Sequence, residues 1–174
     1  QMCISDIDGQ NEKVLFTSKS PIMSPDWSPD RKKIAYVSFE NGFAEIFIQD
    51  LISGKREAIQ ALGMTNSAPV WSPDGKKLAL VVSFSGNPDI FSYSINSKRL
   101  IRLTDHYAID TEPSWSPDSK KIIFTSDRSG GPQLYEINTQ TKRKKRLTKD
   151  GNYNARGKYF PCLLYTSPSP RDGW

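Results

Sequence analysis

The chain has 174 residues, of which 36% are hydrophobic, and it contains 12 prolines and 11 glycines. This composition favours a turn-rich β protein over a helical bundle, and no apolar run reaches the roughly 18–20 residues of a membrane span. With Cys3 and Cys162 as its two cysteines, the chain has no disulfide framework.

The net charge of +5 is concentrated in one segment of the sequence. Residues 142–149 hold six basic side chains and no acid: Lys142, Arg143, Lys144, Lys145, Arg146 and Lys149. Without them, 18 basic residues face 19 acidic ones. A nucleic-acid-binding domain spreads positive charge over a face or stripe, so we expect no nucleic-acid partner. We expect a solvated outer turn whose like charges discourage edge pairing. Contact with an acidic partner or a membrane surface is the alternative.

Residues 1–20 contain two short apolar stretches, near residues 2–4 and 14–16. Asp8-Gly9 between them is a hairpin turn signal. We therefore expect two paired strands here.

Residues 21–64 predict four strands in succession. Prolines flank residues 21–26 and keep them extended up to Trp27, and the turn Ser28-Pro29-Asp30 follows. Strands are expected at 34–38, 45–50 and 56–60, with glycine turns between them at Gly42 and Gly54.

The same order recurs in residues 65–108 and 109–152. Trp27-Ser28-Pro29-Asp30 returns at residues 71–74 and 115–118, each time after 44 residues. The strand residues Ile34, Leu78 and Ile122 and the turn residues Gly42, Gly86 and Gly130 keep this spacing. A fixed period in the low forties with one tryptophan turn per repeat is typical of β-propeller blades.

The repeat is incomplete at both ends. Ile4 and Ile48 lie 44 residues apart, so residues 1–20 predict the second half of a blade. A further unit begins at residue 152 and keeps register through Tyr159 and Pro161, but Cys162 stands where aspartate is due. We expect an all-β, β-propeller fragment of about 3.5 four-stranded blades over residues 1–161. Residues 162–174 resemble translated sequencing adaptor and are expected to be a tail foreign to the fold.

Three whole units of 44 residues are too few to close a ring. Because propellers avoid exposed strand edges by closing, we expect the chain alone to be marginally stable or to aggregate.

The innermost strand of each blade follows the connection between blades, so the residues just before each tryptophan should converge on the mouth of the central channel. The buried strands are near-copies, but these residues differ from blade to blade, which packing does not require. They are Met23, Ser24, Thr65, Asn66, Ser67, Ala68, Asp110, Thr111, Glu112, Asn154, Ala155 and Arg156. We expect a partner-binding site here. The alternative is a set of solvated loop residues with turn and capping roles, and a weaker one is a cation at Asp110 and Glu112.

Other conspicuous residues have structural explanations. The tryptophans in register should pack blade against blade. His106 is the one histidine, so no second histidine joins it in a metal site, and we expect it to be exposed. Asp127 and Arg128 are expected to form a local turn and ion pair.

The repeat resembles the WD40-like β-propeller repeat of the TolB family. The stretches that carry the resemblance are residues 4–9, 23–30, 34–42, 66–69, 111–115, 124–127 and 153–156. The resemblance implies a periplasmic, non-enzymatic propeller of the Tol–Pal system, six-bladed when complete and without a cofactor. It implies binding of the lipoprotein Pal, through which it is peripheral to the outer membrane, with Thr65, Ala68, Thr111 and Glu112 as the best-matched contacts.

The same resemblance implies communication with TolA through an N-terminal domain outside this chain. It also implies roles in outer-membrane integrity and cell-division constriction, and use of the propeller face by some colicins.

Two alternatives remain. Similar propellers gate prolyl-oligopeptidase-type serine peptidases, which need a Gly-x-Ser-x-Gly elbow that this chain lacks. A TolB-like propeller could also serve another surface or transport complex.

Overall fold

The structure is a computed structural model, and it describes residues 2–4, 13–59, 65–83, 86–159 and 164–167. Three four-stranded antiparallel sheets make up most of this part of the chain. Two-stranded sheets flank them, β1 (Met2–Ile4) with β2 (Lys13–Phe16) and β15 (Ala155–Tyr159) with β16 (Leu164–Ser167). The described residues contain no helix, so the structure shows no helix that could span a membrane.

The three complete sheets have one topology, in which the strands follow one another from the inner edge to the outer edge. The first is β3 (Ile22–Trp27), β4 (Lys33–Ser38), β5 (Glu45–Asp50) and β6 (Arg56–Ile59). The second is β7 (Thr65–Trp71), β8 (Lys77–Ser83), β9 (Pro88–Ser94) and β10 (Leu100–Arg102). The third is β11 (Asp110–Trp115), β12 (Lys121–Ser126), β13 (Gln133–Asn138) and β14 (Lys144–Arg146).

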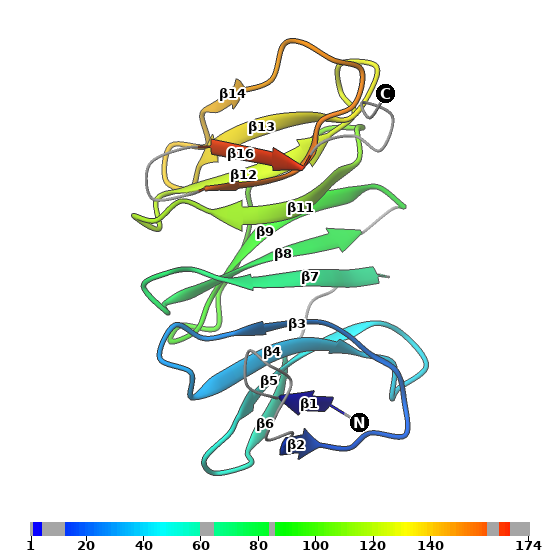
Figure 1. Ribbon diagram of the computed structural model, residues 1–174, viewed down its shortest axis with the longest axis vertical. Coiled ribbons are helices and arrows are strands. Elements are labelled where there is room, and N and C mark those ends of the chain that lie inside the picture. The colour runs from blue at the N-terminus through cyan, green and yellow to red at the C-terminus, as the bar shows by residue number, and fades with distance from the viewer. Residues whose placement is uncertain (1, 5–12, 60–64, 84–85, 160–163, 168–174) are drawn as a thin grey trace.

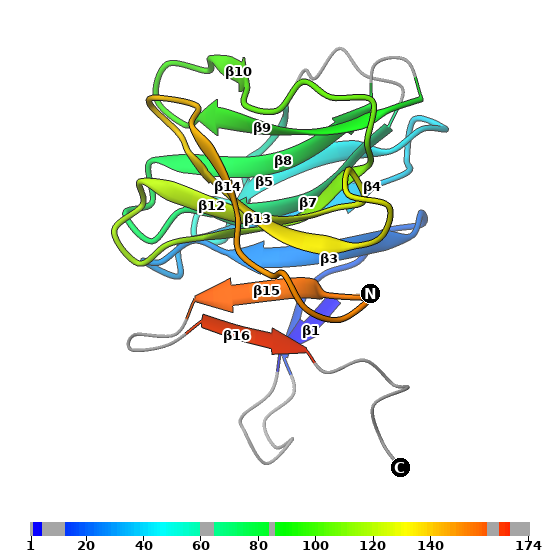
Figure 2. The ribbon, with the colours of Figure 1, turned by 90° about the horizontal axis from the view of Figure 1, so that it is seen from above.

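The sheets succeed one another along the long axis of the molecule (Figure 1), and in the view from above they overlap one another (Figure 2). The inner strands β3, β7, β11 and β15 contact one another in that order. The predicted all-β propeller with 44-residue blades is thereby confirmed.

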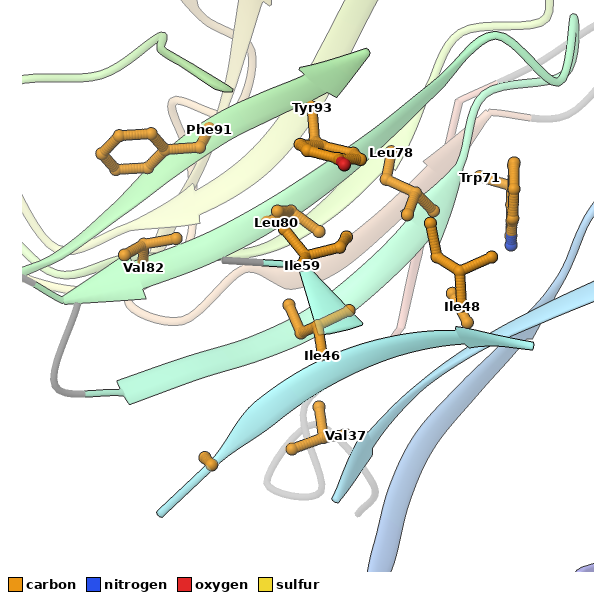
Figure 3. Packing of buried hydrophobic residues seen from close by; sticks show 12 residues of the cluster. Val37, Ile46, Ile48, Ile59, Trp71, Leu78, Leu80, Val82, Phe91 and Tyr93 are labelled. Carbon is orange, nitrogen blue, oxygen red and sulfur yellow. The ribbon is translucent and has the colours of Figure 1, made fainter. Parts of the chain in front are cut away.

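Both faces of each central strand are buried because each blade lies between two neighbours. Val37, Ile46 and Ile48 of the first blade pack against Leu78, Leu80 and Phe91 of the second (Figure 3). The opposite face of the second blade, with Val81 and Ile90, packs against Trp115, Ile122 and Phe124 of the third. The two-sided burial explains why these strands are continuously apolar instead of alternating.

Each Ser-Pro-Asp turn is closed by its own serine. Ser28 Oγ donates to Asp30 Oδ1 at 2.6 Å and accepts from the Lys33 backbone N–H at 2.8 Å. Ser72 and Ser116 repeat both contacts in the other blades. The turn also needs a left-handed residue, which is Gly75 in the second blade but Arg31 in the first, with φ of 57°. Arg31 thus differs from Gly75 in its side chain but has the same left-handed backbone conformation.

Residues 162–174 were expected to lie outside the fold, and β16 differs from that expectation. Leu164–Ser167 pairs with β15, with Leu164 opposite Tyr159. In the complete blades the residue opposite the tryptophan comes seven positions later, as in Trp27 and Ile34, whereas here it comes five positions later. The strand therefore pairs as a second blade strand would, but two residues out of step with the repeat. Residues 162, 163 and 168–174 lie outside the described part.

Candidate partner-binding site

Every inner strand carries a β-bulge at the same place. The register shifts between Met23 and Asp26 in β3, and the corresponding shift recurs in β7, β11 and β15. The bulged residues are Ser24, Ala68, Glu112 and Arg156, 44 residues apart, with φ between 48° and 54°. A left-handed conformation is uncommon for residues other than glycine. Because a bulge changes the direction in which side chains point, it determines which side chains of the inner strand face the axis.

The four bulged residues line one hollow between the inner strands. It has a volume of about 380 Å³ and also contacts the residues after the bulges, including Asp26, Pro69, Pro113 and Lys158. The backbone there repeats from blade to blade, while its side chains are a hydroxyl, a methyl group, a carboxylate and a guanidinium. The predicted contrast between copied frame and dissimilar lining is therefore present.

Glu112 and Arg156 join the third blade to the fourth across this hollow. Arg156 Nε donates to Glu112 Oε1 at 2.9 Å, and the Arg156 backbone N–H donates to Glu112 Oε2 at 3.1 Å. The Thr125 hydroxyl also donates to Glu112 Oε2 at 2.9 Å. The carboxylate raises the pKa of Arg156 and holds the bulge of the neighbouring strand.

Asp26 makes a comparable contact two seams earlier. Its Oδ2 accepts the Trp71 backbone N–H at 2.6 Å, linking the first blade to the second. Burial raises the pKa of Asp26, although the Trp71 amide and the charge of Lys158 act in the opposite direction.

A second, more apolar groove opens where the inner strands begin. It has a volume of about 370 Å³, and Met23, Phe39, Phe43, Ala44 and Ser67 are among its lining residues. Met23 and Phe43 are about half exposed, at 53% and 51%. Ser24 and Asn66 also line the groove.

Further apolar side chains stand exposed at this end of the blades. Tyr107 and Ile109 lie in the connection that leads into β11, and Tyr153 lies just before β15. Because each inner strand starts at the same end, these residues share an end with Met23. We call this end, with the groove and the entrance to the hollow, the entrance face.

Three predicted site residues act as structural anchors. Asn66, Asp110 and Asn154 lie 44 residues apart, at one position of the repeat. Asn66 is buried and donates from Nδ2 to the Ala44 carbonyl at 3.1 Å, and Asn154 Nδ2 donates to the Asp150 carbonyl at 2.9 Å. Each fixes the chain as it enters a new blade. This corresponds to the alternative of residues with turn and capping roles.

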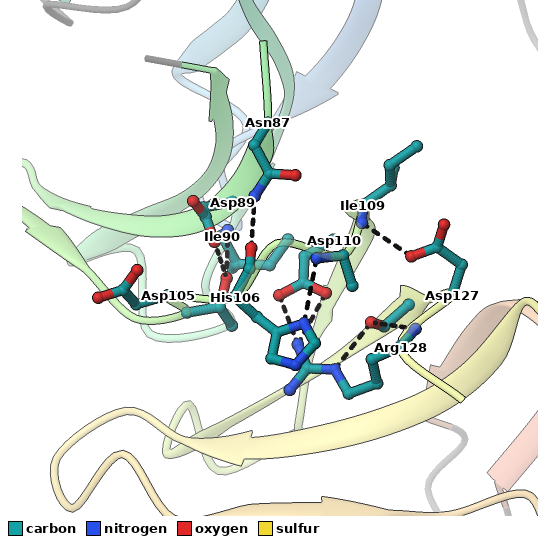
Figure 4. Close-up of polar contacts among 12 residues, drawn as sticks. Asn87, Asp89, Ile90, Asp105, His106, Ile109, Asp110, Asp127 and Arg128 are labelled. Carbon is teal, nitrogen blue, oxygen red and sulfur yellow. Dashed lines mark hydrogen bonds and ion pairs between the residues drawn. The ribbon is translucent and has the colours of Figure 1, made fainter. Parts of the chain in front are cut away.

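Asp110 is fully buried, and its two oxygens accept from Arg128 at 2.8 and 2.6 Å (Figure 4). The guanidinium also lies over the rings of Phe124 and Tyr135. Asp127 accepts the Ile109 backbone N–H at 2.8 Å. The expectation of an ion pair between Asp127 and Arg128 was wrong, because folding brings Arg128 to a carboxylate 18 positions earlier.

The geometry also speaks against a cation at Asp110 and Glu112, since an arginine neutralises each carboxylate. No cluster of three or more metal-ligating side chains occurs among the described residues. His106 was expected to be exposed but is half-buried, and its Nδ1 accepts the Ala108 backbone N–H at 3.0 Å.

The remaining predicted residues fall in two groups. Met23, Ser24, Ser67, Ala68, Glu112 and Arg156 line the groove or the hollow. Thr111 is half-buried in β11 and lines neither, and Thr65 begins β7, where the structure describes its backbone only.

Sequence reasoning missed Phe39 and Phe43 in the turn between β4 and β5. The signal was present in the sequence, because the residues that correspond to Phe43 in the next two blades are Asn87 and Gly131. An apolar residue in one copy of a polar turn is not explained by the common frame.

These features define a β-propeller whose repeated frame presents dissimilar side chains around its axis. Residues 1–163 match the family model described as the TolB beta propeller domain. The chain belongs to this family.

Relatives of known identity agree with the family match. The Tol-Pal system protein TolB of Xylella fastidiosa (strain M12) is 49% identical over 67 residues, which is 38% of this chain and 15% of that protein. The crystal structure of TolB from Acinetobacter baumannii matches with a TM-score of 0.87 and 42% identity, over 98% of this chain and 43% of that one. The chain thus spans less than half the length of these relatives.

A prolyl endopeptidase structure matches with a TM-score of 0.70 over 92% of this chain and 27% of that chain, but at 18% identity it shows the fold alone. The stronger matches identify a non-enzymatic propeller.

Proposed function

We propose that this chain is part of a Tol–Pal system propeller that binds the lipoprotein Pal in the periplasm through its entrance face. One observation carries the proposal: identical bulges in four successive inner strands present dissimilar side chains to a shared hollow beside an apolar groove. The names of the relatives supply the system to which such a surface belongs.

The frame suits binding by a rigid surface. The loops at the entrance face are tied down by buried anchors such as Asn66 and the pair of Asp110 with Arg128. A partner that docks there orders little additional chain, so less of the interaction free energy is lost on association. No bond needs to be made or broken.

The wider roles follow from this binding step. A propeller held by Pal is peripheral to the outer membrane and supports envelope integrity and constriction at division. Contact with TolA would use a domain outside this chain, and colicins that reach the same face would compete with Pal.

The entrance groove provides the first test. Met23→Gln is expected to weaken Pal binding by about tenfold, because a half-exposed apolar side chain in the groove loses its contact with the partner. The measurement is calorimetric titration of purified Pal into the chain.

Ile52→Gln is the matched control, because Ile52 is also apolar and 79% exposed but lies in the turn after β5, at the opposite end of the blades. Its affinity should equal that of the unmodified chain. If both substitutions weakened Pal binding equally, or if neither weakened it, the result would contradict a Pal site at the entrance face.

A further inference from the structure

The ends of the blades opposite the entrance face carry a strong excess of positive charge. This end is formed by the turns between β3 and β4 and between β5 and β6, and by their equivalents in the other two blades. The turns comprise residues 28–33, 50–56, 72–77, 94–99, 116–121 and 138–144, and we call this end the distal face. They lie together at the left-hand edge of Figures 1 and 2.

The six turns hold 14 basic and four acidic side chains, a net charge of +10. The whole chain carries +5, so the remainder carries −5. Part of the excess follows the repeat: Lys32, Lys76 and Lys120 lie 44 residues apart and are all exposed. Lys142, Arg143 and Lys144 of the basic segment are therefore one corner of a larger surface.

The four acidic side chains, which this net charge already includes, also hold the turns in shape. Asp30 and Asp118 accept from the serine and a backbone N–H of their own turns. Asp50 accepts the backbone N–H groups of Ile52 and Ser53.

Ion pairs use only a few of the basic side chains. Lys33 pairs with Asp50, Arg56 with Glu40, Lys98 with Glu57 and Lys121 with Glu136. Within the described part of the chain, Lys32, Lys76 and Lys120 take part in no such pair. Their ammonium groups are in water, where a partner with negative charge would meet them.

We infer that the distal face binds the surface of an anionic lipid bilayer. The charges spread over all three blades and comprise ten lysines and four arginines. Lysine is a compact point charge suited to a diffuse anionic surface, whereas the arginine fork suits individual carboxylates. Ile52 adds an exposed apolar tip to the same face, which an interfacial layer accommodates. An acidic protein segment explains the charge but not the Ile52 tip.

This inference goes beyond the proposed Pal site and uses the other end of the blades. A propeller with both surfaces would hold a bilayer on one side and a protein on the other. Loss of lipid binding would leave Pal binding intact, so the two proposals fail independently.

Vesicle flotation of the full chain tests the inference, since aggregated protein stays at the bottom of the gradient and only bound protein rises. The chain should float with vesicles containing 30 mol% phosphatidylglycerol in phosphatidylcholine at low salt, and not with phosphatidylcholine alone. Flotation should disappear in about 0.5 M salt, where the Debye length is a few Å.

Two double variants with equal charge change locate the surface. Lys76→Glu with Lys120→Glu should reduce the floated fraction about tenfold, because each lysine near an anionic surface adds to binding. Lys19→Glu with Lys149→Glu, at exposed sites of the entrance end, should float like the unmodified chain. Equal loss in both doubles, or flotation on neutral vesicles, would overturn the inference. So would failure to float when the chain binds immobilised polyglutamate, which would indicate an acidic protein partner.

Discussion

At the scale of single residues, the serine of each Ser-Pro-Asp turn stabilises two groups at once. Ser116 Oγ donates to Asp118 and accepts the Lys121 backbone N–H at 2.9 Å, while the serine itself is buried. The Ser116 hydroxyl, with the Lys120 amide, holds the pKa of Asp118 below its ordinary value. A lowered carboxyl pKa contributes stability above the unfolded pKa, and this is lost as the pH falls through the folded pKa.

Ser116→Ala should therefore lower the free energy of unfolding at pH 7 by about 1 kcal/mol, the net worth of a buried hydrogen bond. The deficit should shrink as the pH falls below about 4, the unfolded pKa of aspartate, because the unmodified chain then loses the Asp118 contribution. Urea titrations from pH 7 to pH 2 measure this. Ser97→Ala, in an exposed turn, should change little throughout. A deficit independent of pH would show that Asp118 is not linked to the serine.

At the scale of elements, the bulge in each inner strand separates two roles, anchoring the strand and lining the hollow, which fall to residues two positions apart. Asn66, Asp110 and Asn154 anchor their strands, as Asp110 does with Arg128, whereas the left-handed residue two positions later faces the hollow. Glu112 combines the roles, because it lines the hollow and also holds the Arg156 strand. A charge reversal at Glu112 would disturb the seam as well as the surface, so it tests binding poorly.

Glu112→Ala should cost about 1 kcal/mol, through the lost hydrogen bonds to the Thr125 hydroxyl and the Arg156 backbone N–H. Thermal unfolding followed by circular dichroism measures it. Ser24→Ala is the control, because Ser24 is also left-handed, with φ of 50° against 54° for Glu112, and its side chain makes no hydrogen bond with described residues. A loss of stability as large for Ser24→Ala would attribute the effect to the bulge and not to the seam.

The sequence predicted the blades well because repeated tryptophans, glycines and apolar strands obey one period, and packing enforces that period. It did not separate the anchor Asp110 from the hollow-lining Glu112, because the two residues lie two positions apart in a polar stretch and only the bulge sends them to different places. It also missed the distal face. Its lysines alternate in the sequence with acidic residues that lie elsewhere in the folded chain. A charge count along the sequence therefore cancels charges that are far apart in the structure.

At the scale of the whole molecule, the blades are held by the seams between them. Trp115 illustrates a complete seam: its ring packs with Val81 and Ile90 of the second blade, and its Nε1 donates to the Val70 carbonyl at 3.0 Å. Trp71 is equally buried in the preceding seam, but its Nε1 has no hydrogen-bond partner within the described structure. Tyr159 takes the same position in the next seam and donates to Glu136.

Trp115→Phe is therefore expected to cost about 1 kcal/mol more than Trp71→Phe, because both lose similar apolar area and only one loses a hydrogen bond. Chemical denaturation of the two variants gives the difference directly. Identical losses, or a larger loss for Trp71→Phe, would contradict this account of the seams.

The left-handed bulge has a consequence for how such a surface changes over generations. Serine, alanine, glutamate and arginine already adopt one backbone shape at that position. Substitution at this position in one blade can therefore change which partner is recognised, while the backbone of the propeller stays the same.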